Sequence, residues 1–179
     1  MTETATLTPL QQTVRLGTDL WNDSSDPAEL DYALANGAVG ATSNPPITLE
    51  VLRKEPDPWR ARACELYASC PTWTESQIAW KIYEEIALRG AAVLLPTFER
   101  THGTHGRLSI QTDPTLYRDT DRMVEQGRAF AELAPNLQVK FPVTGAGLRA
   151  IEEATYRGVN INATVSFTVP PALAVGEAV

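Results

Sequence analysis

Lys140 is the residue of this 179-residue chain best placed for chemistry, because it stands in the middle of the strand-like segment LQVKFPV. A lysine amine that is withdrawn from water carries its charge less of the time. The free amine attacks a carbonyl carbon and forms a Schiff base, whose iminium lets a nearby C–C bond break and leave an enamine. The residues alone leave a structural salt bridge as an equally good explanation of Lys140. Lys54 and Lys81 fall on predicted helices and are expected at the surface.

The chemistry also needs a group that moves protons at the hydroxyls of the substrate. Asp23 suits this role, because it ends the first predicted strand on the face that carries polar residues. Asp113, just beyond the third predicted strand, is the other carboxylate close to a strand end. The sequence therefore offers one amine and one acid at the ends of strands.

In each of the five strand-like segments, one of the two faces carries polar residues that interrupt the apolar pattern. Side chains alternate between the two faces of a strand, and strands of a fully covered parallel sheet are normally apolar throughout. A solvated edge explains one such strand, but five in succession favour a polar interior at the carboxyl end of a barrel. The faces concerned hold Asp19, Trp21 and Asp23; Gly40, Thr42 and Asn44; Ser109 and Gln111; Gln138, Lys140 and Pro142; and Asn160, Asn162, Thr164 and Ser166.

Strand-like and helix-like segments alternate along the chain. Strands are predicted at residues 16–23, 38–42, 108–112, 137–143 and 159–167, and helices within 27–36, 46–89, 114–134 and 145–157 and from 170 onward. This order implies an α/β fold with a parallel sheet covered by helices. Periodicity does not distinguish an open doubly wound sheet from part of an eight-stranded β/α barrel. We expect residues 1–16 to form a lead-in and residues 17–179 one domain.

The composition argues against several classes of function. A net charge of −7 disfavours nucleic-acid binding. The longest apolar run, residues 91–95, is far shorter than the roughly 20 residues of a membrane span. The first residues lack the pattern of a secretory signal, and Cys64 and Cys70 are expected to be reduced thiols in one helix. We therefore predict a cytoplasmic protein with no membrane and no nucleic-acid partner.

Three weaker features are explained without a ligand. His102 and His105 in THGTHG lack further ligands at suitable spacing, so a metal site is disfavoured. The run GAGLRA at 145–150 lacks the G-x-G-x-x-G pattern and is expected to begin a helix. Trp21 is expected to fill the core or the barrel interior, although stacking on a substrate is the alternative.

Several runs resemble those of the transaldolase family. GAVGATSNPPI at 37–47 is similar to the family signature at the end of a strand, and residues 137–168 resemble the active-site segment with its Lys-containing and Asn-x-Thr strands. LWNDSS at 20–25 and residues 89–116 match in order and spacing. The resemblance implies a (β/α)8 barrel of the TIM type, here incomplete with about five of its eight β/α units.

The resemblance also implies an activity and a site. Transaldolases move a dihydroxyacetone unit from a ketose phosphate to an aldose phosphate in the pentose phosphate pathway, and they use no metal or organic cofactor. By position, Lys140 matches the Schiff-base lysine and Asp23 the acid/base residue. Asn44 and Asn162 match residues that bind the ketose, and Thr164 matches the threonine that helps to hold the catalytic water. The resemblance implies a sugar-phosphate substrate as the partner. Whether the protein forms homo-oligomers is left open.

Two departures from the family pattern matter. Gln111 stands where the family usually has a glutamate, and a glutamine can hold a water but cannot exchange a proton at neutral pH. Some members that act as fructose-6-phosphate-type aldolases carry glutamine there, so simple aldol chemistry is an alternative. The chain also ends inside the helix after the fifth strand, which predicts an amino-terminal fragment whose first and fifth strands lack partners. A catalytically inactive partial barrel is the other alternative.

Overall fold

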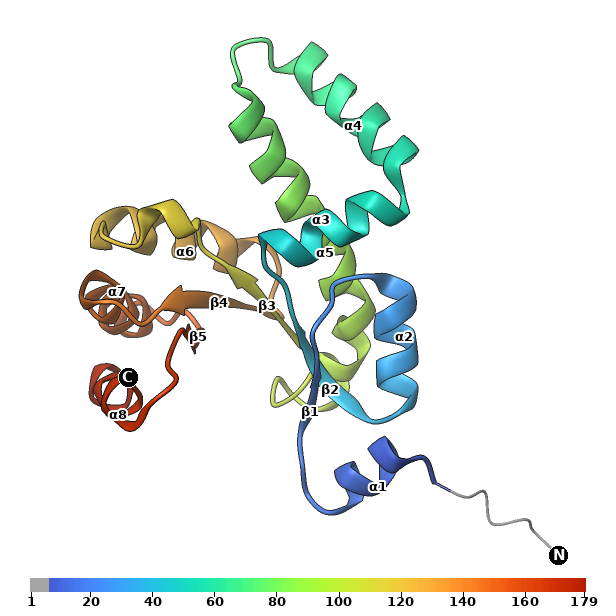
Figure 1. Ribbon diagram of the computed structural model, residues 1–179, viewed down its shortest axis with the longest axis vertical. Helices are drawn as coiled ribbons and strands as arrows, with labels where there is room; N and C mark the ends of the chain where they lie inside the picture. The colour runs from blue at the N-terminus through green and yellow to red at the C-terminus, as the bar shows by residue number, and fades with distance from the viewer. Residues whose placement is uncertain (1–6) are drawn as a thin grey trace, which may run out of the picture.

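Five parallel strands form a curled half-barrel in the computed structural model, which describes residues 7–179 (Figure 1). They pair in chain order, β1-β2-β3-β4-β5, and helices separate them. A doubly wound sheet would reverse its strand order part of the way across, so the sequential order identifies an incomplete β/α barrel. The strands are β1 (Leu20–Asn22), β2 (Ala38–Thr42), β3 (Arg107–Gln111), β4 (Leu137–Pro142) and β5 (Ile161–Thr164).

Side-chain caps define where most of the longer helices begin. Asp26, Asn44, Thr74 and Thr144 each accept a hydrogen bond from a backbone N–H of the first helical turn. The run GAGLRA therefore begins a helix, as expected. The helices are α1 (Pro9–Arg15), α2 (Pro27–Ala35), α3 (Pro45–Lys54), α4 (Pro56–Ser69), α5 (Glu75–Arg100), α6 (Thr120–Leu133), α7 (Gly145–Tyr156) and α8 (Val169–Ala178), with a 3-10 turn η1 (Pro114–Leu116).

Several predicted boundaries were wrong. The first and fifth strands are shorter than predicted, and the fifth ends because Val165 adopts a φ of 61°, outside the extended region. Helix α5 runs eleven residues beyond the predicted stretch and includes Pro96, which removes one backbone donor inside the helix. The predicted helix 114–134 is divided into η1 and α6. Cys70 lies just beyond α4 rather than inside it, and both cysteines are free thiols.

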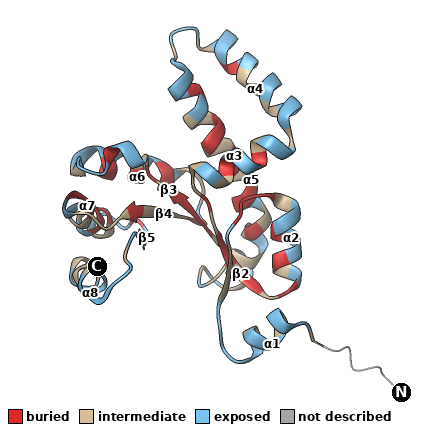
Figure 2. Cartoon of the chain, in the orientation of Figure 1, coloured by how far each residue is buried: buried red, intermediate tan, exposed pale blue. Residues whose placement is uncertain are grey.

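The main core lies on the outer face of the sheet, between the strands and the helices (Figure 2). Burial alternates along β4: Leu137, Val139 and Phe141 are buried, whereas the residues between them are partly exposed. Gly127 of α6 packs directly on the Phe141 ring, because a Cβ atom there would lie 2.4 Å from Phe141 Cζ. The apolar parity of β4 therefore faces the helices, as the sequence pattern predicted.

A second, smaller core joins α4 to the first half of α5, and this helical pair extends away from the sheet (Figure 1). It contains Val51, Leu66, Ile78, Ile82 and Ile86. The α5 isoleucines recur at i, i+4, which puts them on one face of the helix. No helix within residues 7–179 combines the length and the apolar character that crossing a bilayer requires.

Strands β1 and β5 form the two edges of the sheet, and within residues 7–179 each is paired on one side. Apolar residues are exposed after the β5 edge: Phe167 is 87% and Val169 69% exposed to solvent. The predicted parity of the fifth strand therefore fails beyond Thr164, because Val165 and Phe167 leave the sheet instead of packing against helices.

Candidate functional site

Three predicted site residues lie side by side in one row across the sheet. The register pairs Gln111 of β3 with Lys140 of β4, and Lys140 with Asn162 of β5. Thr164 lies opposite Pro142, one step closer to the carboxyl ends of the strands. Residues in register on neighbouring parallel strands are separated by roughly 4.8 Å. The fold therefore brings Gln111, Lys140, Asn162 and Thr164 together.

Lys140 points to the inner face of the half-barrel. Its neighbours Val139 and Phe141 are fully buried against the outer helices, and side chains alternate along a strand. Lys140 itself is only partly buried, so the strong desolvation predicted for it is not found in this five-stranded arc. Within residues 7–179, no carboxylate lies within ion-pair distance of its amine. Within these residues, Lys140 makes no structural salt bridge.

Asn162 is oriented by a neighbour on β3. Its Nδ2 donates a hydrogen bond of 2.8 Å to Ser109 Oγ, and Ser109 is fully buried. Ser109 lies two residues before Gln111 on the same face of β3. The bond therefore runs from β5 to β3, across β4, on the inner face of the sheet. Since the amide nitrogen is engaged, the Asn162 carbonyl oxygen is the atom left to accept a hydrogen bond from a ligand.

Asp23 and Asn44 lie on the β1–β2 side of the same strand ends. Thr42 Oγ1 donates a hydrogen bond of 2.7 Å to Asp23 Oδ1, and Asp23 is otherwise exposed. Asn44 follows β2 and caps α3, where its Oδ1 accepts from the Ile47 amide at 2.9 Å. Both belong to the carboxyl edge of the sheet, but neither contacts the row of Lys140 through a hydrogen bond or an ion pair.

Two hollows accompany these residues. One of about 250 Å³ at the carboxyl ends of β3–β5 is lined by Gln111, Thr144 and Thr164 among others. A second of about 440 Å³ on the inner face is lined by Trp21, Thr42, Gln138 and Asn162 together with apolar residues. Trp21 rests on Gly40, where a Cβ atom would lie 2.8 Å from the indole ring. Trp21 thus lies on the inner face of the half-barrel and lines the second hollow.

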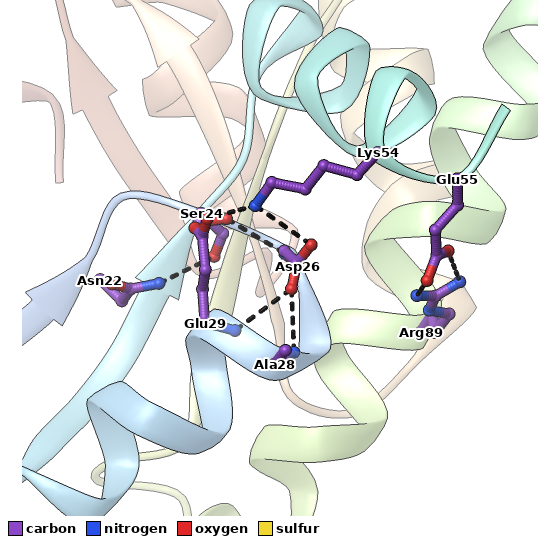
Figure 3. A network of polar contacts seen from close by, with 8 residues as sticks. All are labelled: Asn22, Ser24, Asp26, Ala28, Glu29, Lys54, Glu55 and Arg89. Carbon is purple, nitrogen blue, oxygen red and sulfur yellow. Dashed lines mark hydrogen bonds and ion pairs between the residues drawn. The ribbon is translucent and has the colours of Figure 1, made fainter.

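A polar network, buried only at Ser24 and Asp26, supports the segment after Asp23 (Figure 3). Asp26 caps α2 by accepting from the amides of Ala28 and Glu29 at 2.9 and 3.2 Å. Lys54, the last residue of α3, pairs with Asp26 at 3.3 Å and with Glu29. The network therefore ties the helix that follows Asp23 to the helix that Asn44 begins.

The same contacts perturb the acids of this network. Burial by itself raises the pKa of Asp26, but the hydrogen bonds from the Glu29 amide and Lys54 outweigh it and lower the pKa below its usual value. A hydrogen bond from Lys54 lowers the pKa of Glu29, and one from Arg89 lowers the pKa of Glu55. Lys54 is exposed, as predicted, yet it connects two helices.

Sequence reasoning missed three residues that hold the candidate site. Ser109 and Thr42 were placed on the correct face, but nothing in the sequence indicated that they bond to Asn162 and Asp23. Tyr83 is a core residue of α5, and its hydroxyl bonds to the backbone of Gln111, which the sequence pattern did not indicate. Asp113 caps η1 through Thr115 and is not aimed at the row of Lys140.

The loop before β3 lies at the opposite end of the strands from these residues. There His105 Nε2 is 3.7 Å from Asp19 Oδ2. Within residues 7–179, no group of three His, Cys, Asp or Glu side chains is arranged to hold a metal ion. The candidate site therefore consists of an amine, amides, hydroxyls and one carboxylate.

Comparisons with known proteins agree with the geometry. Residues 20–179 match the family model described as Transaldolase/Fructose-6-phosphate aldolase. A protein named Transaldolase from Thermobifida fusca is 36% identical, over 95% of this chain and 48% of the relative. Another, from Thiobacillus denitrificans, is 36% identical over 92% of this chain and 47% of the relative. The transaldolase of Acidothermus cellulolyticus is 30% identical over 90% and 45%. The chain spans about half the length of these relatives.

Proposed function

Because this chain belongs to the transaldolase/fructose-6-phosphate aldolase family, we propose that it carries the Schiff-base part of a transaldolase site. The reaction transfers a dihydroxyacetone unit from a ketose phosphate to an aldose phosphate. The pentose phosphate pathway, which the family resemblance implies, and the cytoplasmic location, which the composition favours, belong to the same proposal. We also propose that residues 17–179 form one barrel unit.

In the proposed mechanism, the Lys140 amine attacks the ketose carbonyl and loses water to form an iminium. Asp23 accepts the proton of the C4 hydroxyl while the C3–C4 bond breaks, which releases an aldose and leaves an enamine on Lys140. The enamine then attacks the carbonyl of the acceptor aldose, and Asp23 returns the proton to the new hydroxyl. Water finally hydrolyses the iminium and frees the amine.

The other residues of the row bind and orient in this proposal. The Asn162 carbonyl oxygen is available to accept from a ketose hydroxyl, since Ser109 engages the amide nitrogen. Gln111 and Thr164 line the same hollow and can hold the attacking water between them. Asp23 and Asn44 would approach the substrate from the β1–β2 side. A closed barrel would draw these strands together.

The register of Gln111, Lys140 and Asn162 is the observation that carries the proposal. It puts a lysine that has no carboxylate partner within residues 7–179 between two amide side chains that can hydrogen-bond hydroxyls.

Reductive trapping tests the proposal. The chain is incubated with dihydroxyacetone or fructose 6-phosphate and borohydride, and the modified lysine is identified by mass spectrometry. We expect one adduct at Lys140, none in Lys140→Ala, and an unchanged adduct in Lys81→Ala, whose lysine pairs with Glu84 on the surface of α5.

The assay is repeated with the remaining half of the Thermobifida fusca transaldolase supplied as a second polypeptide, because the matched region covers 48% of that protein. We expect the trapping rate to rise when the inner face is covered. Equal labelling of Lys54, Lys81 and Lys140 in both arms would overturn the proposal.

A further inference from the structure

The Tyr83 hydroxyl makes two hydrogen bonds to one residue of the candidate site. It accepts from the Gln111 amide at 2.8 Å and donates to the Gln111 carbonyl oxygen at 3.1 Å. Tyr83 comes from α5 and is 3% exposed, so water does not compete for these bonds. A single phenol thus satisfies both backbone groups at the end of β3.

These two backbone groups face a gap in the sheet. The Ser43 amide donates to the Ser109 carbonyl at 2.8 Å, so residue 109 points its backbone toward β2. Residue 111, two positions later, points the same way. By that level β2 has ended and Asn44 has begun α3. The Tyr83 hydroxyl therefore occupies the position of the strand partner that β2 no longer supplies.

The next residue connects Gln111 to Lys140. The Thr112 amide and its Oγ1 both donate to the Lys140 carbonyl oxygen, at 3.1 and 3.3 Å. Thr112 is 1% exposed. A displacement of the β3 end would therefore move the backbone of Lys140 as well as that of Gln111.

The surroundings hold the phenol in one position. The Tyr83 ring meets Trp80 edge-on with a centroid distance of 5.0 Å, and it packs on Phe130 at 6.3 Å. Burial raises the pKa of Tyr83, so the hydroxyl keeps its proton and can both donate and accept. The ring packing would persist in a phenylalanine variant, which isolates the role of the hydroxyl.

We propose that Tyr83 is a positioning residue for the candidate site: its hydroxyl hydrogen-bonds the backbone N–H and C=O of Gln111 where β2 ends and, through Thr112, fixes the position of Lys140. The effect of Tyr83 on Schiff-base formation at Lys140 rests on the proposed function, whereas the hydrogen-bond geometry does not depend on it. We therefore expect Lys140 to react differently once the hydroxyl is removed.

The test compares Tyr83→Phe with the unaltered chain and with Tyr67→Phe, whose hydroxyl is on an exposed side chain of α4. Amide exchange at Gln111, followed by NMR, is expected to accelerate about tenfold or more because a buried hydrogen bond is lost. Acetic anhydride labelling of Lys140 relative to Lys81 is expected to change about threefold or more. The rate constant of dihydroxyacetone trapping should fall at saturating ketose.

Unchanged Gln111 exchange in Tyr83→Phe would overturn the inference. Faster exchange with the labelling ratio of the unaltered chain would also overturn it, because Tyr83 would then be only a stabilising residue. If no variant traps a ketose but the labelling ratio still changes, the proposed function fails and the positioning role holds. Should Tyr83→Phe not fold, Thr112→Val applies the same labelling test to the second link.

Discussion

Replacing Asp26 by alanine should destabilise the segment that positions Asp23, and the structure gives the size of the effect. Asp26 is 7% exposed and accepts the Ala28 and Glu29 amides at the start of α2. Loss of an N-cap of this kind costs about 1 kcal/mol, within a range of about 0.5–2. The ion pair with Lys54 adds only a few tenths of a kcal/mol, because the Lys54 side chain is 45% exposed.

The free energy of unfolding of Asp26→Ala is therefore expected to fall by about 1–2 kcal/mol. Asp26→Asn keeps a capping oxygen and loses only the charge, so it should lose less than about 1 kcal/mol. Asp57→Ala is the matched control, because Asp57 is also in the first turn of a helix but its side chain is 89% exposed. This control should stay within about 0.5 kcal/mol of the unaltered chain.

Urea titrations followed by circular dichroism, with coincident transitions by tryptophan fluorescence, measure these differences. The reasoning is refuted if Asp26→Ala is no less stable than Asp57→Ala. It is also refuted if Asp26→Asn loses as much as Asp26→Ala, because the cap would then contribute nothing and the charge everything.

Two further outcomes are expected. The pKa values of Asp26, Glu29 and Glu55 are lowered in the folded chain. The stability that these carboxylates give to the fold is therefore complete above about pH 4.5 and is lost as the pH falls through the folded-state pKa values. Urea midpoints that stay constant from pH 7 to 3 would contradict this. Gly40→Ala should cost about 1–3 kcal/mol by overpacking against Trp21 and should shift tryptophan emission. Gly176→Ala, which lies in α8 and meets no atom within 4 Å, should instead stabilise by up to about 1 kcal/mol.

The alternation of apolar and polar residues made much of the site predictable. The pattern in 137–143 placed Val139 and Phe141 in the outer core and Lys140 on the inner face, because a strand has a period of two and needs no tertiary information to express it. The same argument failed after Thr164. There a positive φ at Val165 ends the strand, and a β-branched residue gives no local signal of that conformation.

Contacts between distant segments were beyond the sequence pattern. Tyr83 has the spacing of a core residue on α5, and 28 positions separate it from Gln111, to which it bonds. Ser109 and Asn162 are separated by 53 positions. Such bonds depend on the stagger between the strands and on the residue at which β2 ends. The local periodicity of the sequence specifies neither.

By itself the sequence determined the alternation of strands and helices, the polar inner face and the motifs shared with the transaldolases, since all of these reside in residue type and local spacing. Only the tertiary structure decided that the five strands pair in chain order as an arc and that Gln111, Lys140 and Asn162 share one row. Register and strand order are properties of pairs of segments, and the physical chemistry of one segment does not specify its partner.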